Sequence, residues 1–311
     1  MRIAFAGVAH SHPFTDAATA KTLGVEDIVV FDADDGERLT AFCRQTYARP
    51  CFSLAELLSA LPDVVIVTTR PDRTASTVRA ILDSGIPCFL NKVGAPSMVK
   101  LAALDQAINN RDKAFFTSSV LRFAPEVRKL EEKTRGLRIE VADVSIQHSI
   151  ADFLTPERRW QDEPEDGGGT AVSLGLHGWE LLDVVLQDHI DVIFASTSKS
   201  PSSDTHSENV VAFIGRTRRE STLVTHKVLG LGNGENYRLS LYGEDFVYKA
   251  DLSGLNPVTS LGYLDCMRAV LQLAQGAPPP ISWERSRKIL KTTIYAAELG
   301  RREYFLGGTT L

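Results

Sequence analysis

Short apolar runs alternate with amphipathic segments over roughly the first 120 residues. The uniformly apolar, β-branched runs predict strands, and the segments between them have the spacing and capping residues of helices. One helix start is marked by Ser53 with Glu56 three residues later, which is a capping box. Buried strands separated by helices are typical of a parallel sheet that is covered on both faces. The expected strands are Ile3–Ala6, Asp27–Phe31, Asp63–Thr69, Pro87–Leu90 and Lys113–Ser118, and the expected helices are Asp16–Leu23, Glu37–Thr46, the segment from Ser53, Arg73–Ser84 and Ser97–Arg111. The pattern predicts a doubly wound α/β Rossmann domain over residues 1–120.

The pattern changes after Arg122, where strand-like runs follow one another without helices between them. Consecutive strands of this kind favour an antiparallel sheet. We therefore expect residues 121–311 to form an α+β domain with an open antiparallel sheet. Its expected strands are 138–148, 192–198, 209–215, 221–229, 237–242 and 246–249, and its expected helices are 126–134, 170–186, 261–275 and 283–300.

Composition agrees with a globular chain of two domains. The 311 residues are 43% hydrophobic and 23% charged, and the net charge is −5. A slightly negative net charge does not indicate binding to nucleic acid or to an anionic membrane. The four cysteines have no metal-ligand spacing and are too sparse for a disulfide scaffold, so we expect reduced thiols. With no secretory leader and no apolar run near the length of a membrane span, we expect a cytoplasmic protein.

The turn after the first strand is the first candidate for chemistry. It reads Gly7-Val8-Ala9-His10-Ser11-His12, so only the first glycine of the G-x-G-x-x-G dinucleotide pattern is present. Ala9 is a mild replacement, whereas His12 is expected to push the following helix outward or to lengthen the turn. We expect His10 and His12 to line cofactor phosphates or the substrate entrance. Two histidines without a third clustered ligand make a poor zinc site, so no metal is expected.

Asp32 ends the second strand, where a carboxylate can accept hydrogen bonds from an adenosine ribose. A solvated turn acid is the alternative. Ala33 follows without an adjacent cation for a 2′-phosphate, which favours NAD over NADP. We expect Arg38, the nearest other cation, to lie on a helix surface.

Two further segments carry polar groups that suit a catalytic site. Asn91 and Lys92 follow the fourth strand, and the triple glycine Gly167–Gly169 precedes Ser173 and His177. Ser173 and His177 are four residues apart on an expected helix, with Glu180 on the same stripe. A lysine beside a nicotinamide cation can exchange protons with a substrate hydroxyl. Spacing alone leaves open that Lys92 is a surface lysine and that His177 is a core histidine.

The chain resembles the Gfo/Idh/MocA oxidoreductases, which include glucose-fructose oxidoreductase and inositol dehydrogenase. Matching features are the first turn, Asp32, Thr68-Thr69, Lys92, Arg122-Phe123-x-Pro125, the triple glycine with His177, and Gly300-Arg301-Arg302. The family usually has Glu where this chain has Asn91, and often Asp where it has Ser173. The resemblance implies that Lys92 transfers the proton and that His177 orients the substrate. The expected cofactor-binding residues are Gly7, Ala9, His10, His12, Asp32, Thr68, Thr69, Asn91 and Lys92, and the expected substrate-binding residues are Arg122, Trp160, Ser173 and His177.

These features together predict an NAD(H)-dependent oxidoreductase that acts on a hydroxyl or carbonyl of a sugar, cyclitol or related polar molecule. Two alternatives stay open. One is a lyase or hydrolase that retains its NAD, as some family members do. The other is a catalytically silent binding or regulatory protein, which the changed glycine turn, Asn91 and Ser173 favour.

The second domain also suggests a substrate-facing loop and an interface. Residues 147–160 and the strands with His226 and Tyr237 are expected to face the substrate, offering Arg158, Arg159 and Trp160; an ordinary surface loop is the alternative. Residues 210–214 are apolar on both faces of their strand, so part of the sheet lacks a cover. We expect a homodimer or homotetramer formed through residues 190–250. A monomer is the alternative, because Lys199, Arg216, Arg218 and Arg219 lie near strand ends.

Overall fold

The computed structural model describes residues 1–34, 36–201, 203–232, 234–254 and 256–307. The chain divides into two compact units. Unit 1 comprises Met1–Ser118 and Gly262–Arg287, and unit 2 comprises Ser119–Leu261 and the chain from Lys288 onward. The first division lies close to the expected boundary at residue 120. Residues 262–287, which we placed in the second domain, instead group with unit 1 because helix α10 (Tyr263–Ala274) packs against α1 (His12–Thr22) and β4 (Val64–Val67).

Unit 1 is built on a six-stranded parallel sheet in the order β3-β2-β1-β4-β5-β6. This is the strand order of a doubly wound dinucleotide-binding fold, so the prediction of a Rossmann domain is confirmed. All four residues of β4 are buried, as its uniformly apolar sequence requires. The other strands are β1 Arg2–Ala6, β2 Asp27–Phe31, β3 Arg49–Pro50, β5 Cys88–Asn91 and β6 Phe115–Ser118. The two-residue strand β3 was not predicted.

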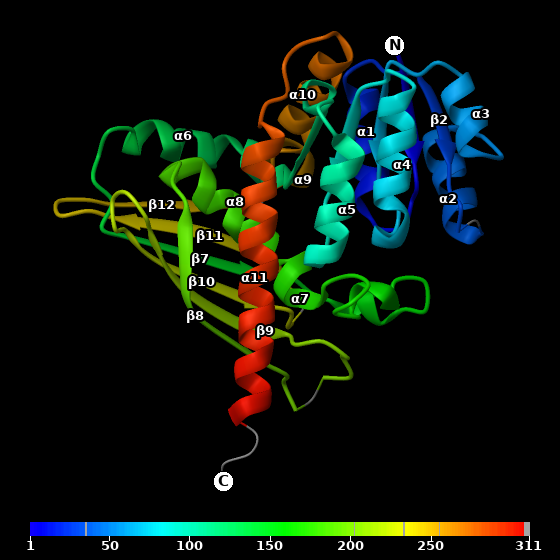
Figure 1. Cartoon of the computed structure of the whole chain (residues 1–311). Coiled ribbons are helices and arrows are strands. Elements are labelled where there is room, and N and C mark those ends of the chain that lie inside the picture. Colours follow the sequence, from blue (N-terminus) through cyan, green and yellow to red (C-terminus); the bar gives the residue numbers. More distant parts are fainter. Residues whose placement is uncertain (35, 202, 233, 255, 308–311) are drawn as a thin grey trace. The chain divides into compact units, whose positions relative to one another are not determined.

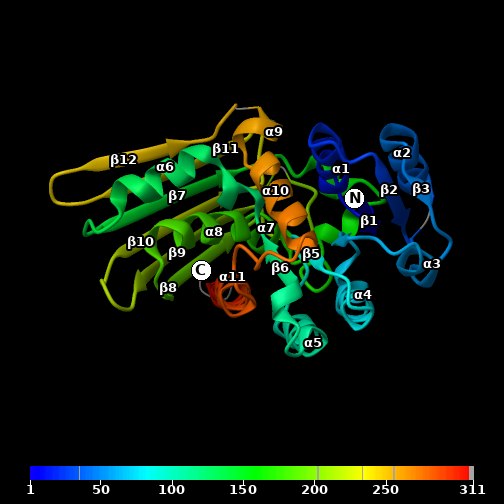
Figure 2. The same ribbon diagram turned by 90° about the horizontal axis from the view of Figure 1, so that it is seen from above.

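Helices cover both faces of this sheet, with α1 and α2 on one face and α4 and α5 on the other (Figure 2). Their bounds are α2 Glu37–Thr46, α3 Leu54–Ser59, α4 Pro71–Asp83 and α5 Met98–Ile108, and a 3-10 turn spans Asp112–Ala114. The predicted capping box starts α3. Ser53 Oγ accepts a 3.0 Å hydrogen bond from the Glu56 amide, and the Glu56 carboxylate accepts one of 2.7 Å from the Phe52 amide.

Unit 2 holds a second six-stranded sheet in the order β12-β11-β7-β10-β9-β8 (Figure 1). We expected this sheet to be antiparallel throughout, but β7 and β10 are parallel, so the sheet is mixed. The reason is topological. Strands β10 and β11 run in opposite directions and β7 lies between them, so β7 must be parallel to one of the two. The strands are β7 Val141–Gln147, β8 Ile190–Ser198, β9 Val210–Thr217, β10 Leu223–Leu229, β11 Asn236–Tyr242 and β12 Val247–Asp251.

Helices α6 and α8 pack on one face of the second sheet. The helix expected over residues 170–186 is broken at Leu174 into α7 (Gly169–Ser173) and α8 (Gly175–Leu186). The long C-terminal helix α11 (Trp283–Gly307) begins in unit 1 and continues in unit 2. The remaining elements are α6 Pro125–Thr134, α9 Pro257–Ser260 and 3-10 turns at Val120–Phe123, Ala151–Leu154 and Arg159–Gln161.

Candidate functional site

The carboxyl ends of β1 and β4 meet at Gly7. This glycine has φ +97°, and a Cβ placed on it would lie 2.6 Å from the Thr69 nitrogen. The Thr68 hydroxyl donates a hydrogen bond to the Gly7 carbonyl, and the Ala9 amide donates to the Thr68 carbonyl over 3.2 Å. Only glycine allows this close approach. Because β1 and β4 are where the strand order reverses, Gly7 and Thr68 lie at the point where doubly wound folds bind ligands.

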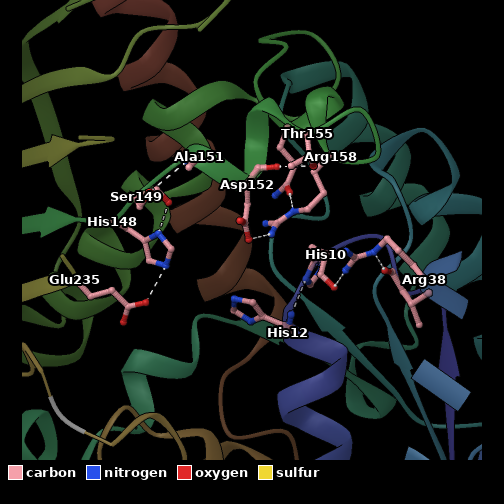
Figure 3. Close-up of polar contacts among 12 residues, drawn as sticks. His10, His12, Arg38, His148, Ser149, Ala151, Asp152, Thr155, Arg158 and Glu235 are labelled. Atoms are coloured by element: carbon pink, nitrogen blue, oxygen red, sulfur yellow. Dashed lines mark hydrogen bonds and ion pairs between the residues drawn. The ribbon is translucent and has the colours of Figure 1, made fainter. Parts of the chain in front are cut away.

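The rest of the β1–α1 turn is held by side chains (Figure 3). His10 Nδ1 accepts a hydrogen bond of 3.3 Å from the His12 amide, and their rings meet edge to face. The His12 ring also packs against Tyr263 of α10, which accommodates its bulk. Arg38 donates to the carbonyls of Val8 and His10 over 2.9 and 2.7 Å. Arg38 was expected on a helix surface; instead its guanidinium group donates to two carbonyls of this turn and so links α2 to it.

Asp32 lies beside the same turn. Its two carboxylate oxygens accept backbone hydrogen bonds, 2.6 Å from the Val8 amide and 2.8 Å from the Asp34 amide. Burial raises the pKa of Asp32, and these hydrogen bonds oppose the rise. The alternative of a merely solvated turn acid does not describe this partly buried group, which joins β2 to the β1–α1 turn.

Asn91 and Lys92 lie at the carboxyl end of β5, two strands from β1. The Asn91 side chain is buried, and its Nδ2 donates a 2.6 Å hydrogen bond to the carboxylate of Asp16 on α1. Lys92 is partly buried. Asp16 was missed at the sequence level. A signal existed, because Asp16 shares the apolar i, i+3, i+4 stripe of α1 with Pro13, Ala17 and Ala20, where a carboxyl group is out of place.

Two arginines that follow β4 were also missed. Arg70 Nε lies 2.8 Å from the Asp34 carboxylate, and Arg73 pairs with the other oxygen of the same group. These cations come from a segment almost forty residues beyond Asp34 in the chain, so adjacency in sequence could not reveal them. Thr69, between β4 and these arginines, shares a 3.1 Å hydrogen bond with Thr74.

In unit 2, His177 is buried on α8 and its Nδ1 lies 2.5 Å from Ser119 Oγ. Its ring also packs against Tyr237 of β11, with centroids 6.0 Å apart. Ser119 follows β6 directly, and it was not predicted. The imidazole is therefore oriented by a hydroxyl on one side and an aromatic ring on another, which suits a substrate-orienting group as well as a core histidine.

Arg122 lies in a buried ion cluster with two carboxylates of α8. It is buried, its Nε lies 2.5 Å from Glu180, and its other guanidinium nitrogen pairs with Asp183. The two carboxylates of α8 thus engage two nitrogens of its guanidinium group, and substrate binding by Arg122 stays a prediction. Glu180 is paired with Arg122, near the start of unit 2. Its carboxylate therefore does not form a polar stripe with Ser173.

Ser173 likewise does not lie on one helix with His177. The helix breaks at Leu174, and Ser173 Oγ donates a 3.3 Å hydrogen bond to the carbonyl of Gly167. The hydroxyl thus closes the glycine turn from which α7 begins. Gly167 itself packs against the backbone of Trp160 and Gln161, where a Cβ would clash. Trp160 is partly buried, and its proposed contact with substrate stays a prediction.

The loop after β7 carries its own polar pairs (Figure 3). Arg158 is buried and donates hydrogen bonds of 2.6 Å to Asp152 and to Gln161. These bonds join residues within the loop, so the side chain is not exposed for contact with a substrate. His148 lies within the range 147–160 that was expected to face the substrate, but it was not singled out there. Its Nε2 lies 3.1 Å from Glu235, and its ring lies 6.5 Å from that of Tyr237.

His226 was expected to face the substrate, but it is fully buried beneath α8. Its ring packs against Trp179 and Phe213 and against Gly178, where a Cβ would overlap the imidazole. Neither ring nitrogen has a hydrogen-bond partner among the described residues. Burial lowers the pKa of His226 to about 3, so it is a neutral core residue.

Two structural findings bear on the class of protein. No helix within the described part of the chain has the length and apolar character needed to cross a membrane. Cys43, Cys51, Cys88 and Cys266 are all free thiols, as expected.

Comparison with family models finds no match, and comparison with curated proteins finds none. Solved structures do match over nearly the whole chain. GenD2 from gentamicin A biosynthesis, in complex with NAD, is 17% identical with a TM-score of 0.83, over 97% of this chain and 95% of that one. A myo-inositol dehydrogenase from Corynebacterium glutamicum is 14% identical with a TM-score of 0.80, over 97% of each chain.

An oxidoreductase from Agrobacterium radiobacter in complex with NAD+, L-tartaric acid and magnesium is 15% identical with a TM-score of 0.75, over 97% of each chain. Identities this low show the fold. The chain therefore has the fold of these dehydrogenases and oxidoreductases, which is the fold that its resemblance to the Gfo/Idh/MocA family implies.

Proposed function

We propose that this protein is an NAD(H)-dependent oxidoreductase of the Gfo/Idh/MocA type that acts on a hydroxyl or carbonyl of a sugar, cyclitol or related polar molecule. The observation that carries the proposal is the carboxyl edge of the parallel sheet in unit 1. There Gly7 closes on Thr68, Asp32 stands on one side, and Asn91 with Lys92 stands on the other. The fold shared with NAD complexes supports the same conclusion.

The residues at this edge fit a dinucleotide. The Gly7 turn leads into the N-terminus of α1, which has Pro13 in its first turn and no side-chain cap, as suits a pyrophosphate. Asp32 is placed to accept hydrogen bonds from a ribose, and Asn91 Oδ1 is a buried acceptor without a partner among the described residues. When bound, NAD would supply hydride acceptance or donation at its nicotinamide.

In this proposal, Lys92 accepts the proton of the substrate hydroxyl in the oxidative direction and returns it in the reductive direction. His177, fixed by Ser119 and Tyr237, orients the substrate oxygen through its imidazole. The protein's contribution is then positioning and proton transfer, while the hydride chemistry belongs to the cofactor.

The test is turnover by the Lys92→Ala variant on a substrate found from a panel of sugars, cyclitols and sugar acids with NAD. We expect kcat to fall by about 10²–10⁴-fold while NADH binding is retained. Lys129→Ala, on the surface of α6, is the control for loss of a lysine charge. Turnover equal to wild type would overturn the assignment. NAD that copurifies without net NADH formation would instead favour the lyase or hydrolase alternative.

We further propose that the protein pairs through the uncovered face of its second sheet. Phe194 and Ile214 are neighbours across β8 and β9, and both are exposed, as is Ile193 beside them. Tyr242 and Val247 form a second exposed apolar pair, on β11 and β12. Exposed apolar area of this kind usually marks an interface.

The assembly is tested by sedimentation at micromolar concentration. We expect a dimer or tetramer for wild type and dissociation for Phe194→Asp, but no change for Val99→Asp, which alters an exposed valine of α5 in unit 1. A wild-type mass equal to that of one chain would contradict this proposal.

Free thiols also support the expected cytoplasmic location, which fractionation of cells would test.

A further inference from the structure

The end of β2 carries an ion-pair cluster beside Asp32. Asp34 lies two residues past Asp32 and donates its amide to the Asp32 carboxylate over 2.8 Å. Its own carboxylate binds Arg70 Nε at 2.8 Å and the guanidinium of Arg73. Arg70 precedes α4 and Arg73 belongs to its first turn. Two cations from the segment after β4 are therefore held at the edge where β2 ends.

This cluster acts electrostatically on Asp32. Burial and the backbone hydrogen bonds set the pKa of Asp32 first, and the charge of Asp34 then raises it while the charge of Arg73 lowers it. In dinucleotide-binding folds, the acid at this position contacts the ribose 2′-hydroxyl of NAD, and a nearby arginine accommodates the 2′-phosphate of NADP. Arginine suits that task because its planar donors match phosphate oxygens.

We propose that Asp34 is a specificity-determining residue for the cofactor, because it engages Arg70 and Arg73 in ion pairs and so withholds them from a 2′-phosphate. The proposal rests on the dinucleotide binding proposed above. With Asp34 present, its carboxylate pairs with both guanidinium groups, so the site accepts a neutral hydroxyl and repels a phosphate. Without Asp34, Arg70 and Arg73 lose the carboxylate that they share, and a 2′-phosphorylated dinucleotide becomes the better ligand.

The cluster lies at the surface, which makes it suitable for mutation. The side chains of Arg70 and Arg73 are 37% and 41% exposed, and that of Asp34 is 23% exposed. Ion pairs this accessible contribute little to folding, so variants of Asp34 are expected to fold. The backbone hydrogen bond from residue 34 to Asp32 does not need the Asp34 side chain and stays available.

The experiment measures the Kd of NADH and of NADPH for the full chain by cofactor fluorescence at low ionic strength. We expect wild type to bind NADH more tightly than NADPH. Asp34→Ala is expected to bind NADPH at least about tenfold more tightly than wild type does, with little change for NADH. The gain should shrink as salt is added, because the arginines are solvent-accessible.

Two further variants make the result specific. Asp34→Ala combined with Arg73→Ala should lose the gain in NADPH affinity, since one of the two cations is gone. Asp72→Ala is the matched control, because it removes an exposed carboxylate 3.8 Å from Arg73 that does not hold the arginines beside Asp32. It should leave the preference for NADH in place.

The outcomes separate this inference from the proposed function. NADH binding with an unchanged NADPH affinity in Asp34→Ala would overturn the role of Asp34 alone. Tighter NADPH than NADH binding by wild type would also overturn it, since the arginines would then be available despite Asp34. Absence of binding of either dinucleotide by wild type would overturn the proposed function and this inference with it.

Discussion

Asp16 on α1 and Asn91 at the end of β5 share a buried hydrogen bond of 2.6 Å from Asn91 Nδ2 to Asp16 Oδ2. Both side chains are only 2% exposed. Because the amide nitrogen of Asn91 donates this bond, the other side-chain atom, Oδ1, is left as a buried acceptor without a partner among the described residues. The amide at position 91 therefore lies against a carboxyl group that comes from helix α1.

The Asp16 carboxyl should make stability depend on pH. Burial raises its pKa to about 7, against the hydrogen bond from Asn91, which lowers it. The folded state then binds more protons than the unfolded state between about pH 4 and pH 7, so the free energy of unfolding falls across this range as pH rises. In wild type this fall in the free energy of unfolding should be on the order of a few kcal/mol, and Asp16→Asn should abolish it. Urea unfolding of wild type and variant at a series of pH values measures it, and parallel curves would contradict the expectation.

Breaking the buried ion cluster of Arg122 should destabilise unit 2. Arg122→Ala leaves Glu180 and Asp183 as buried carboxylates without their cation, which costs about 3–5 kcal/mol of unfolding free energy. Arg128→Ala, which breaks the exposed 3.1 Å pair with Glu131, should cost no more than about 1 kcal/mol. Chemical denaturation compares the two. Equal losses would show that the Arg122 cluster does not behave as a buried pair.

Gly7→Ala should destabilise the protein by more than the cost of placing an alanine at a positive φ. Gly7 and Gly24 both have positive φ, but a Cβ on Gly7 would press on the backbone of Thr68 and Thr69, whereas one on Gly24 would meet nothing within 4 Å. Gly24→Ala therefore isolates the conformational cost of about 1 kcal/mol. We expect Gly7→Ala to lose more than about 2 kcal/mol and to weaken NADH binding. Similar values of Tm and Kd for the two variants would argue against a tight junction of β1 and β4.

Ser119→Ala should lower activity without unfolding the protein. The hydroxyl orients the His177 ring over 2.5 Å, so its removal leaves the buried imidazole without that partner. We expect kcat/KM for the proposed reaction to fall by about 5- to 100-fold, with the Kd of NADH unchanged. Ser59→Ala, whose hydroxyl bonds a carbonyl on an exposed helix, is the control. An unchanged kcat/KM would mean that Ser119 does not position His177 for catalysis.

The local sequence pattern was enough to predict the main helices and strands of unit 1, although not the two-residue strand β3. The apolar run around Val64–Val67, the helix at Glu37–Thr46 and the cap at Ser53 all depend on residues a few positions apart, and they occur as predicted. The same information placed Gly7 and Asp32 at strand ends, where a parallel sheet gathers its functional groups. Side-chain period and capping chemistry act over short range, so the sequence alone determines them.

Long-range pairing decided the rest. The partners of Arg122 and Asp34 come from segments far away in the chain, and no periodicity encodes which carboxylate a buried or half-buried arginine will meet. The order of strands in unit 2 is similar, because β7 reaches its place between β10 and β11 only when the sheet assembles. His226 shows the physical reason most directly. Its strand alternation permits either face, and only the packing of α8 against β10 decides that the ring is buried and neutral.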